Sequence, residues 1–191
     1  DEDGTASFDI PPLDNTAMDG YAVRAEDTRG ASAESPAVLR VTGEVAAGYP
    51  PQQAVAPGTA IRIMTGAPVP EGADTVVPFE ETNEMELRRR EGRITEIAIL
   101  KELEGGSNIR SAGEDVLQGT TVLQAGTLLR PAEIGVLASV GRVRVQVVRR
   151  PIVAVLATGD ELMEPGQPLR AGQIYDSNNY SVAAAVLRHG G

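Results

Sequence analysis

Residues 61–72 read IRIMTGAPVPEG, and this stretch decides how the first half of the chain is interpreted. The apolar run 60–64 is typical of a buried strand. The loop after it holds two prolines, spaced by one residue, between two glycines. Because proline fixes its own backbone torsion, this loop is stiff and can hold Thr65 still for hydrogen bonding. A rigid turn without a function explains the same residues equally well.

Short apolar runs separated by turn residues continue on both sides of this segment, at 38–41 and 75–77. Glycine and proline are frequent, with 21 and 13 copies in 191 residues. These frequent turn residues between apolar runs predict a β-rich module and argue against a helical bundle.

The stretch 85–103 fits two structures. Leu87 and the three arginines at 88–90 fit a helix, whereas the isoleucines at 94, 97 and 99 favour a strand after a turn at Gly92. We predict a hairpin here. The arginine triplet is expected to form a solvated face rather than an anion site.

The last third of the chain changes in character. Pro131 and Gly141 are expected to bound a short helix, and the alternation in 142–147 predicts a half-exposed strand. The continuous apolar run 152–157 predicts a strand of a parallel sheet, and residues 176–178 are typical of a helix N-cap. Together these features predict the opening of an α/β domain. One βα unit cannot cover both faces of a parallel strand, and the sequence stops where a second strand is expected to begin. We therefore expect a truncated sequence.

Charge and composition narrow the function classes. The net charge of −10 has the wrong sign for long-range attraction to nucleic acid or to anionic membranes, so neither partner is expected. With no cysteine and one histidine, an ordinary structural zinc site is excluded. No apolar run approaches the roughly 20 residues that span a bilayer, and the acidic start is not a signal peptide. We expect a soluble, cytoplasmic protein.

Carboxylates near loop glycines and strand ends are the groups best suited to chemistry. They are Asp19, Glu80, Glu81, Glu114, Asp115, Asp160, Glu161 and Asp176. Such groups suit Mg²⁺, which takes a few oxygen ligands and keeps several waters.

Each carboxylate also has a structural explanation. Asp19 fits a turn, Glu80 and Glu81 a solvated strand end, and Asp176 an N-cap. Pairing with Arg110 explains Glu114 and Asp115 as well as function does. The pair at 160–161 favours function, because ligands of open α/β sheets gather outside the carboxyl ends of strands.

Four segments taken together resemble the molybdopterin molybdenumtransferases, the bacterial MoeA and gephyrin E-domain family. They are DNTAMDGYAV at 14–23, IRIMTGAPVPEGAD at 61–74, NIR and GED within 108–115, and TGDEL and GQIYDSN within 158–178. They follow the family's order over nearly the whole chain. The resemblance implies an enzyme of the last step of molybdenum cofactor assembly. That step uses adenylylated molybdopterin and molybdate, releases AMP and depends on a divalent cation, usually Mg²⁺.

The resemblance also implies an α+β multidomain fold. Residues 1–25 with 116–149 would form an elongated, β-rich linking domain, and residues 26–115 an inserted β-rich module. Residues 150–191 would begin an α/β domain that binds molybdopterin. Family segments expected before and after this sequence include a glycine- and serine-rich loop and anion-binding lysines, so this fragment alone is expected to be inactive.

Position by position, the residues that match those needed for activity in the family are Asp19, Thr65, Asp115 and Glu161. The resemblance implies that Asp19 and Asp115 position the metal or its water and that Thr65 bonds substrate. Glu161 would orient the pterin or phosphate side. The residues expected to contact the bound molecules are Arg110, Asp160, Asp176 and Ser177.

The implied assembly is a homodimer whose subunits complete each other's sites, with the molybdopterin adenylyltransferase as a further partner. One alternative is a scaffold that keeps the fold for partner binding, as the gephyrin branch does. A second alternative, which follows from the residues alone, is a Mg²⁺-dependent phosphoanhydride hydrolase that needs no molybdate.

Overall fold

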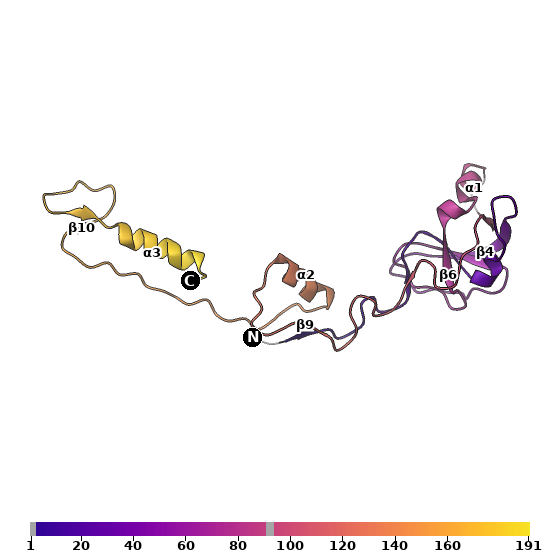
Figure 1. The fold of residues 1–191 in the computed structure, drawn as a ribbon, viewed down its shortest axis with the longest axis horizontal. Helices are drawn as coiled ribbons and strands as arrows, with labels where there is room; N and C mark the ends of the chain where they lie inside the picture. The colour runs from indigo at the N-terminus through magenta and orange to yellow at the C-terminus, as the bar shows by residue number, and fades with distance from the viewer. Residues whose placement is uncertain (1–2, 91–93) are drawn as a thin grey trace. The chain divides into compact units, whose positions relative to one another are not determined.

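The computed structural model describes residues 3–90 and 94–191 of the chain. Two compact units divide these residues, Asp3–Val143 and Arg144–Gly191, and each is described by itself. Figure 1 shows that the first unit carries most of the strands. No helix of the described residues is long and apolar enough to cross a membrane.

A five-stranded sheet is the main element of the unit Asp3–Val143. In sheet order its strands are β6 (Thr75–Pro78), β3 (Gly20–Val23), β5 (Thr59–Ile63), β4 (Ala37–Val45) and β7 (Glu96–Ile99). Neighbours run antiparallel except for the parallel pair β4 and β5. The sheet confirms the predicted β-rich module.

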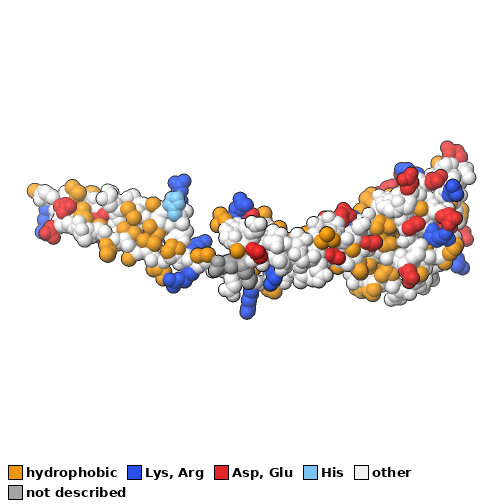
Figure 2. Space-filling view, turned by 60° about the horizontal axis from the view of Figure 1, so that its bottom comes forward, with side chains coloured by type: hydrophobic (Ala, Val, Ile, Leu, Met, Phe, Trp, Pro, Cys, Tyr) orange, Lys and Arg blue, Asp and Glu red, His pale blue; other side chains and the backbone are white. Residues whose placement is uncertain are grey.

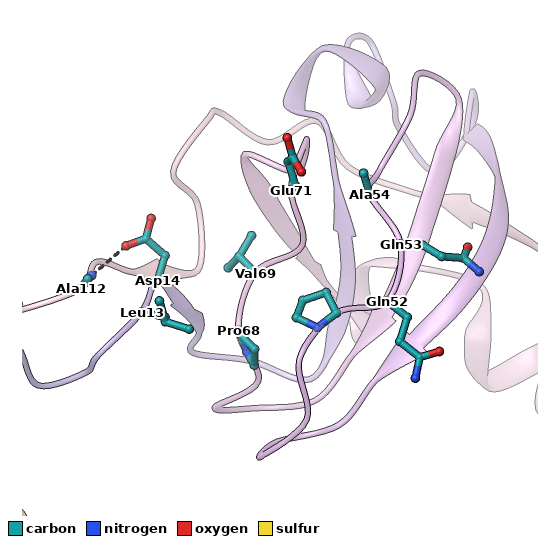
Figure 3. Close-up of a pocket in the computed structure, with 10 residues that line it drawn as sticks. Leu13, Asp14, Gln52, Gln53, Ala54, Pro68, Val69, Glu71 and Ala112 are labelled. Atoms are coloured by element: carbon teal, nitrogen blue, oxygen red, sulfur yellow. Dashed lines mark hydrogen bonds between the residues drawn. The ribbon is translucent and has the colours of Figure 1, made fainter.

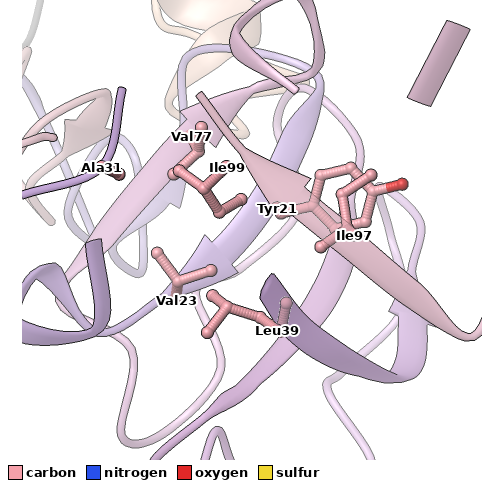
Figure 4. Close-up of a cluster of buried hydrophobic side chains, with 8 residues drawn as sticks. Tyr21, Val23, Ala31, Leu39, Val77, Ile97 and Ile99 are labelled. Atoms are coloured by element: carbon pink, nitrogen blue, oxygen red, sulfur yellow. The ribbon is translucent and has the colours of Figure 1, made fainter. Parts of the chain in front are cut away.

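Both faces of the inner strands β3 and β5 are buried, and β6 is buried over most of its length, which agrees with the mostly apolar sequences of these three strands. Along β3, Tyr21 and Val23 point to one face, where they pack with Leu39, Ile97 and other apolar side chains (Figure 4). Ala22 belongs to a second cluster that includes Ile61 and Ile63, as the strand's two-residue period requires. β3 lies before the expected domain boundary at residue 25, yet it is an inner strand of the sheet. The division into a linking domain and an insert stays a prediction.

The predicted hairpin over 85–103 is wrong in its first half. A helix, α1 (Glu84–Arg90), precedes β7, and the turn expected at Gly92 lies outside the described residues. The hydroxyl of Thr82 accepts a hydrogen bond from the N–H of Glu84, and Leu87 packs on the core. Burial of one helical face therefore decides between the two structures that the sequence allowed.

The segment before β3 pairs with the segment after β7. β1 (Gly4–Thr5) pairs with β9 (Thr121–Leu123), and β2 (Asn15–Thr16) pairs with β8 (Ile109–Arg110), both antiparallel. Single turns of 3₁₀-helix, η1 (Ala25–Thr28) and η2 (Phe79–Glu81), connect strands of the large sheet. The predicted short helix is confirmed as α2 (Pro131–Ser139), with proline in its first turn.

The unit Arg144–Gly191 contains a short parallel pair, β10 (Leu162–Met163) and β11 (Ile174–Tyr175), followed by α3 (Ser177–Arg188). A parallel pair followed by a helix is the element order of an α/β unit, and the assignment of residues 150–191 to an α/β domain stays a prediction. The strands predicted at 142–147 and 152–157 are wrong, since neither stretch is a strand in the part of the chain that the structure describes. A strand needs a neighbour to accept its backbone hydrogen bonds, and no described segment pairs with 152–157. Most of the apolar side chains in these two stretches are exposed, among them Val143, Val147, Ile152 and Leu156. Figure 2 shows hydrophobic side chains at the surface of the molecule.

Gly20 tests the packing of β3. A Cβ there would overlap the carbonyl oxygen of Val77 on β6, whereas a Cβ at Gly43 on β4 has its nearest neighbour 4.0 Å away. We expect Gly20→Ala to lower the free energy of unfolding by at least about 2 kcal/mol. Gly43→Ala should change it little. Chemical denaturation measures both, and equal midpoints for the two variants would contradict this packing.

Candidate functional site

Asp19 and Thr65 meet at the end of the β3–β5 pair. Gly20 of β3 lies opposite Ile63 of β5, so the residue before β3 faces the residues that follow β5. One carboxylate oxygen of Asp19, Oδ1, accepts two hydrogen bonds from Thr65, each 2.7 Å long, from its amide N–H and from its hydroxyl. The structure thus brings together two of the predicted site residues from segments 46 positions apart.

These contacts favour the ionised form of Asp19. The pKa of its carboxyl is lowered, first by the backbone hydrogen bond from Thr65, then by the Thr65 hydroxyl, and to a lesser degree by the charge of Arg62. Both hydrogen bonds to the Asp19 carboxylate end on Oδ1, and no described residue donates one to Oδ2. Oδ2 is therefore available to a cation, a water or a substrate.

The loop after Thr65 is stiff, as its prolines predict. Its Gly66 amide donates to the carbonyl of Thr16, its Val69 amide donates to the carbonyl of Asp14, and its Ala67 carbonyl accepts from the amide of Thr16. The loop is therefore fastened to β2 and to the residue before it. This arrangement holds Thr65 from both sides, since β5 fixes the preceding residues.

Arg110 and Asp115 form a second group on the other side of β2. Arg110 lies opposite Asn15 in the β2–β8 pair. Its Nη2 donates to Oδ2 of Asp115 at 2.6 Å, and its Nε lies 3.7 Å from Glu114. The Asp115 carboxylate raises the pKa of the Arg110 guanidinium. The sequence explained Glu114 and Asp115 equally well by pairing with Arg110 and by function. In this structure both side chains pair with Arg110.

Asp19 and Asp115 are not joined by a hydrogen bond. Each carboxylate has its own donor, Thr65 for Asp19 and Arg110 for Asp115. No group of three or more acidic, histidine or cysteine side chains within residues 3–90 and 94–191 is arranged to hold a metal ion. Glu81, another candidate, pairs with Lys101 at 3.0 Å, which agrees with a solvated strand end.

A pocket of about 580 Å³ lies beside the stiff loop (Figure 3). Pro68, Val69 and Glu71 of the loop line it, together with Asp14, whose carboxylate accepts a hydrogen bond from the amide of Ala112 at 2.7 Å. The sequence predicted a stiff loop that holds Thr65, but it did not predict a pocket beside that loop. The Pro-Val-Pro spacing was the available signal, because it makes a wall that keeps its shape.

The remaining predicted residues lie in the unit Arg144–Gly191. Asp160 and Glu161 are exposed beside β10, and the Glu161 carbonyl accepts from the amide of Ile174 at 2.8 Å. Asp176 is buried and caps α3, with its carboxylate accepting from the Asn179 amide at 2.9 Å. It also lines a pocket of about 440 Å³ formed by residues of 153–182. Ser177 is the exposed first residue of α3.

Removing the Thr65 hydroxyl tests the Asp19 contact. In Thr65→Val we expect the pKa of Asp19 to rise but to stay below its ordinary value, because the stronger donor, the backbone N–H, remains. A lowered pKa stabilises the fold above the unfolded-state pKa, and that contribution, smaller in the variant, is lost as the pH falls through the folded-state pKa. NMR titration of the carboxyl carbon measures the shift. Thr121→Val, in a different sheet, is the control, and an unchanged pKa in Thr65→Val would contradict the contact.

A second variant tests the role of Asp176. Asp176→Ala should destabilise α3 by about 1 kcal/mol, because the amide of Asn179 loses its acceptor. Amide hydrogen exchange in the first turn of α3 should quicken, whereas Ser177→Ala should leave it unchanged. Equal exchange in both variants would mean that Asp176 does not cap the helix.

Comparison with known proteins supplies the family. A family model described as the MoeA N-terminal region (domain I and II) matches residues 1–141. Molybdopterin molybdenumtransferase 2 of Mycobacterium tuberculosis is 46% identical over 184 residues, which cover 96% of this chain and 44% of that protein. The molybdopterin molybdenumtransferase of Bacillus subtilis is 39% identical over 189 residues, covering 99% of this chain and 43% of that protein.

Solved structures agree. A crystal structure of the molybdopterin biosynthesis moeA protein from Pyrococcus horikoshii superposes with a TM-score of 0.85 at 38% identity, and the match covers all of this chain and 48% of that one. The chain spans less than half the length of these relatives. These matches confirm the resemblance carried by the four motif segments. The chain belongs to the MoeA family, whose N-terminal region it matches.

Proposed function

We propose that this chain is part of a molybdopterin molybdenumtransferase, which inserts molybdate into adenylylated molybdopterin and releases AMP. The observation that carries the proposal is the Asp19 carboxylate, held by two hydrogen bonds from Thr65 with its second oxygen open. Relatives that are 39–46% identical bear the name of this enzyme. Both residues lie in segments that match the family's motifs.

Asp19 is suited to a divalent cation shared with substrate. Mg²⁺ is commonly held by one or two carboxylates, with phosphate oxygens and waters filling its other positions. A single ionised carboxylate with one open oxygen fits that role, and it needs no cluster of three acidic side chains. When bound, Mg²⁺ would supply positive charge between Asp19 and an anionic substrate.

The other side chains of the site orient Asp19 and Asp115 and bind the substrate in this proposal. Thr65 fixes the direction of the Asp19 carboxylate, and its hydroxyl is exposed for a second contact with substrate. Arg110 donates a hydrogen bond to Asp115 and so orients that carboxylate, and we assign its remaining N–H groups to an anion of the substrate. On the pterin or phosphate side we place Asp160, Glu161, Asp176 and Ser177.

Two anionic substrates approach a chain whose net charge is −10. We therefore expect cationic groups besides Arg110 to bind them, and we place these groups in the rest of the protein and in a second subunit of a homodimer. The adenylyltransferase that makes adenylylated molybdopterin is a further partner in this proposal. We place the reaction in the cytoplasm.

Turnover by the full-length protein tests the proposal. We expect AMP release from adenylylated molybdopterin to require both Mg²⁺ and molybdate. Asp19→Asn and Asp115→Asn should each lower turnover by about 100-fold or more, because each removes a charge while keeping the size of the side chain.

Asp27→Asn is the matched control, since the Asp27 carboxylate also accepts a backbone N–H, from Gly58, on the same unit. It should leave turnover unchanged. AMP release that is indifferent to molybdate would identify a hydrolase instead. Absence of turnover in the folded wild-type protein would favour a scaffold.

A further inference from the structure

A buried ion pair lies inside the unit Asp3–Val143, whose other buried side chains are apolar or uncharged among the described residues. Arg62 of β5 and Glu84 of α1 have side chains that are only 11% and 2% exposed. Nε of Arg62 lies 3.2 Å from Oε1 and 3.0 Å from Oε2 of Glu84. In the sequence, the pair is marked only by an arginine within the apolar run 60–64.

The same guanidinium ties two strand ends together. Nη1 of Arg62 donates to the carbonyl oxygens of Gly20, at 3.2 Å, and Ile63, at 2.8 Å. Gly20 and Ile63 lie opposite each other in the β3–β5 pair. Gly20 directly follows Asp19, and Ile63 precedes Thr65 by two residues. Arg62 therefore holds the backbone from which both site residues project.

Glu84 in turn fixes the guanidinium. It lies at the start of α1, where its amide donates to Thr82, and Nε of Arg88 donates to its Oε1 at 2.5 Å. The ring of Tyr21 lies 5.5 Å from Cζ of Arg62, and burial together with the charge of Glu84 raises the pKa of Tyr21.

A buried ion pair is a poor source of stability, because well-packed apolar side chains of similar volume stabilise a fold as well or better. What apolar side chains cannot supply is an N–H group for the carbonyls of Gly20 and Ile63. The arrangement therefore serves geometry more than stability.

We propose that Arg62, held by Glu84, is the positioning residue for the contact between Asp19 and Thr65. Arg62 acts through the backbone of β3 and β5 and does not itself contact substrate. The inference rests on the proposed function for the meaning of that contact, and its test is separable from it.

Hydrogen–deuterium exchange of residues 64–67 in the full-length protein measures the positioning directly. All four amides are hydrogen-bonded: Met64 to the Val45 carbonyl, Thr65 to Asp19, Gly66 to the Thr16 carbonyl and Ala67 to the Met64 carbonyl. In Arg62→Gln we expect exchange here to quicken by at least about tenfold, because a glutamine is too short to hold both strand ends. Arg88→Gln, which removes the exposed partner of Glu84, is the control and should leave these amides protected.

Arg62→Gln alone leaves the Glu84 charge buried and unpaired, so it can also destabilise the whole fold. The double variant Arg62→Gln/Glu84→Gln removes both charges. We expect exchange in the core strand β7 to return to the wild-type rate, while residues 64–67 stay fast. Wild-type protection of 64–67 in the double variant, or exchange that rises equally in β7, would overturn the positioning role.

Turnover then separates this inference from the proposed function. Fast exchange at 64–67 together with a loss of turnover supports both. Fast exchange with wild-type turnover supports the positioning role of Arg62 and contradicts the part assigned to Asp19 and Thr65 in the reaction.

Discussion

Two hydrogen bonds from Thr65 to a single oxygen of Asp19 close the end of the β3–β5 pair, and the candidate site depends on them. They are short because the strand register places the start of one strand beside the end of the other. Gly20 lets β3 lie tightly against β6, where a side chain would overlap Val77. The sheet thus decides where the carboxylate projects before any ligand binds, which is the preorganisation that binding sites require.

The backbone around Asp19 and Thr65 is also bonded to the segments that precede and follow the large sheet. The loop that carries Thr65 is fastened to residues 14–16, and the strand there pairs with the one that carries Arg110. One backbone network therefore supports both the Asp19 group and the Arg110 group. It explains how residues from three motif segments occupy one unit although they are distant in sequence.

Local patterns predicted much of the fold. Apolar runs bounded by glycine and proline correspond to β4, β5 and β6, and Pro131 and Asp176 marked the starts of α2 and α3. The errors have a common physical cause, since partners distant in the chain decide the outcome. Packing of Leu87 on the core favoured a helix at 84–90, and no described strand lies beside the apolar run 152–157 to pair with it.

In the candidate site too, local sequence predicted some features, and partners distant in the chain decided the others. Family resemblance supplied the positions of Asp19 and Thr65, but only the β3–β5 register explains their contact. The structural role of Asp176 was foreseen from local capping rules, whereas the roles of Arg62 and Glu84 were not, because the pair joins a strand to a helix that the sequence did not predict.

A double-mutant cycle between Asp19 and Thr65 tests the central contact most directly. The free energy of unfolding is measured for Asp19→Ala, Thr65→Val and the double variant at a pH where Asp19 is ionised. If the hydroxyl acts through the carboxylate, the second substitution should cost little once the first is made, so the double variant falls short of the sum of the single effects. Strictly additive effects would show that the two side chains do not interact, and the account of this site would fail with them.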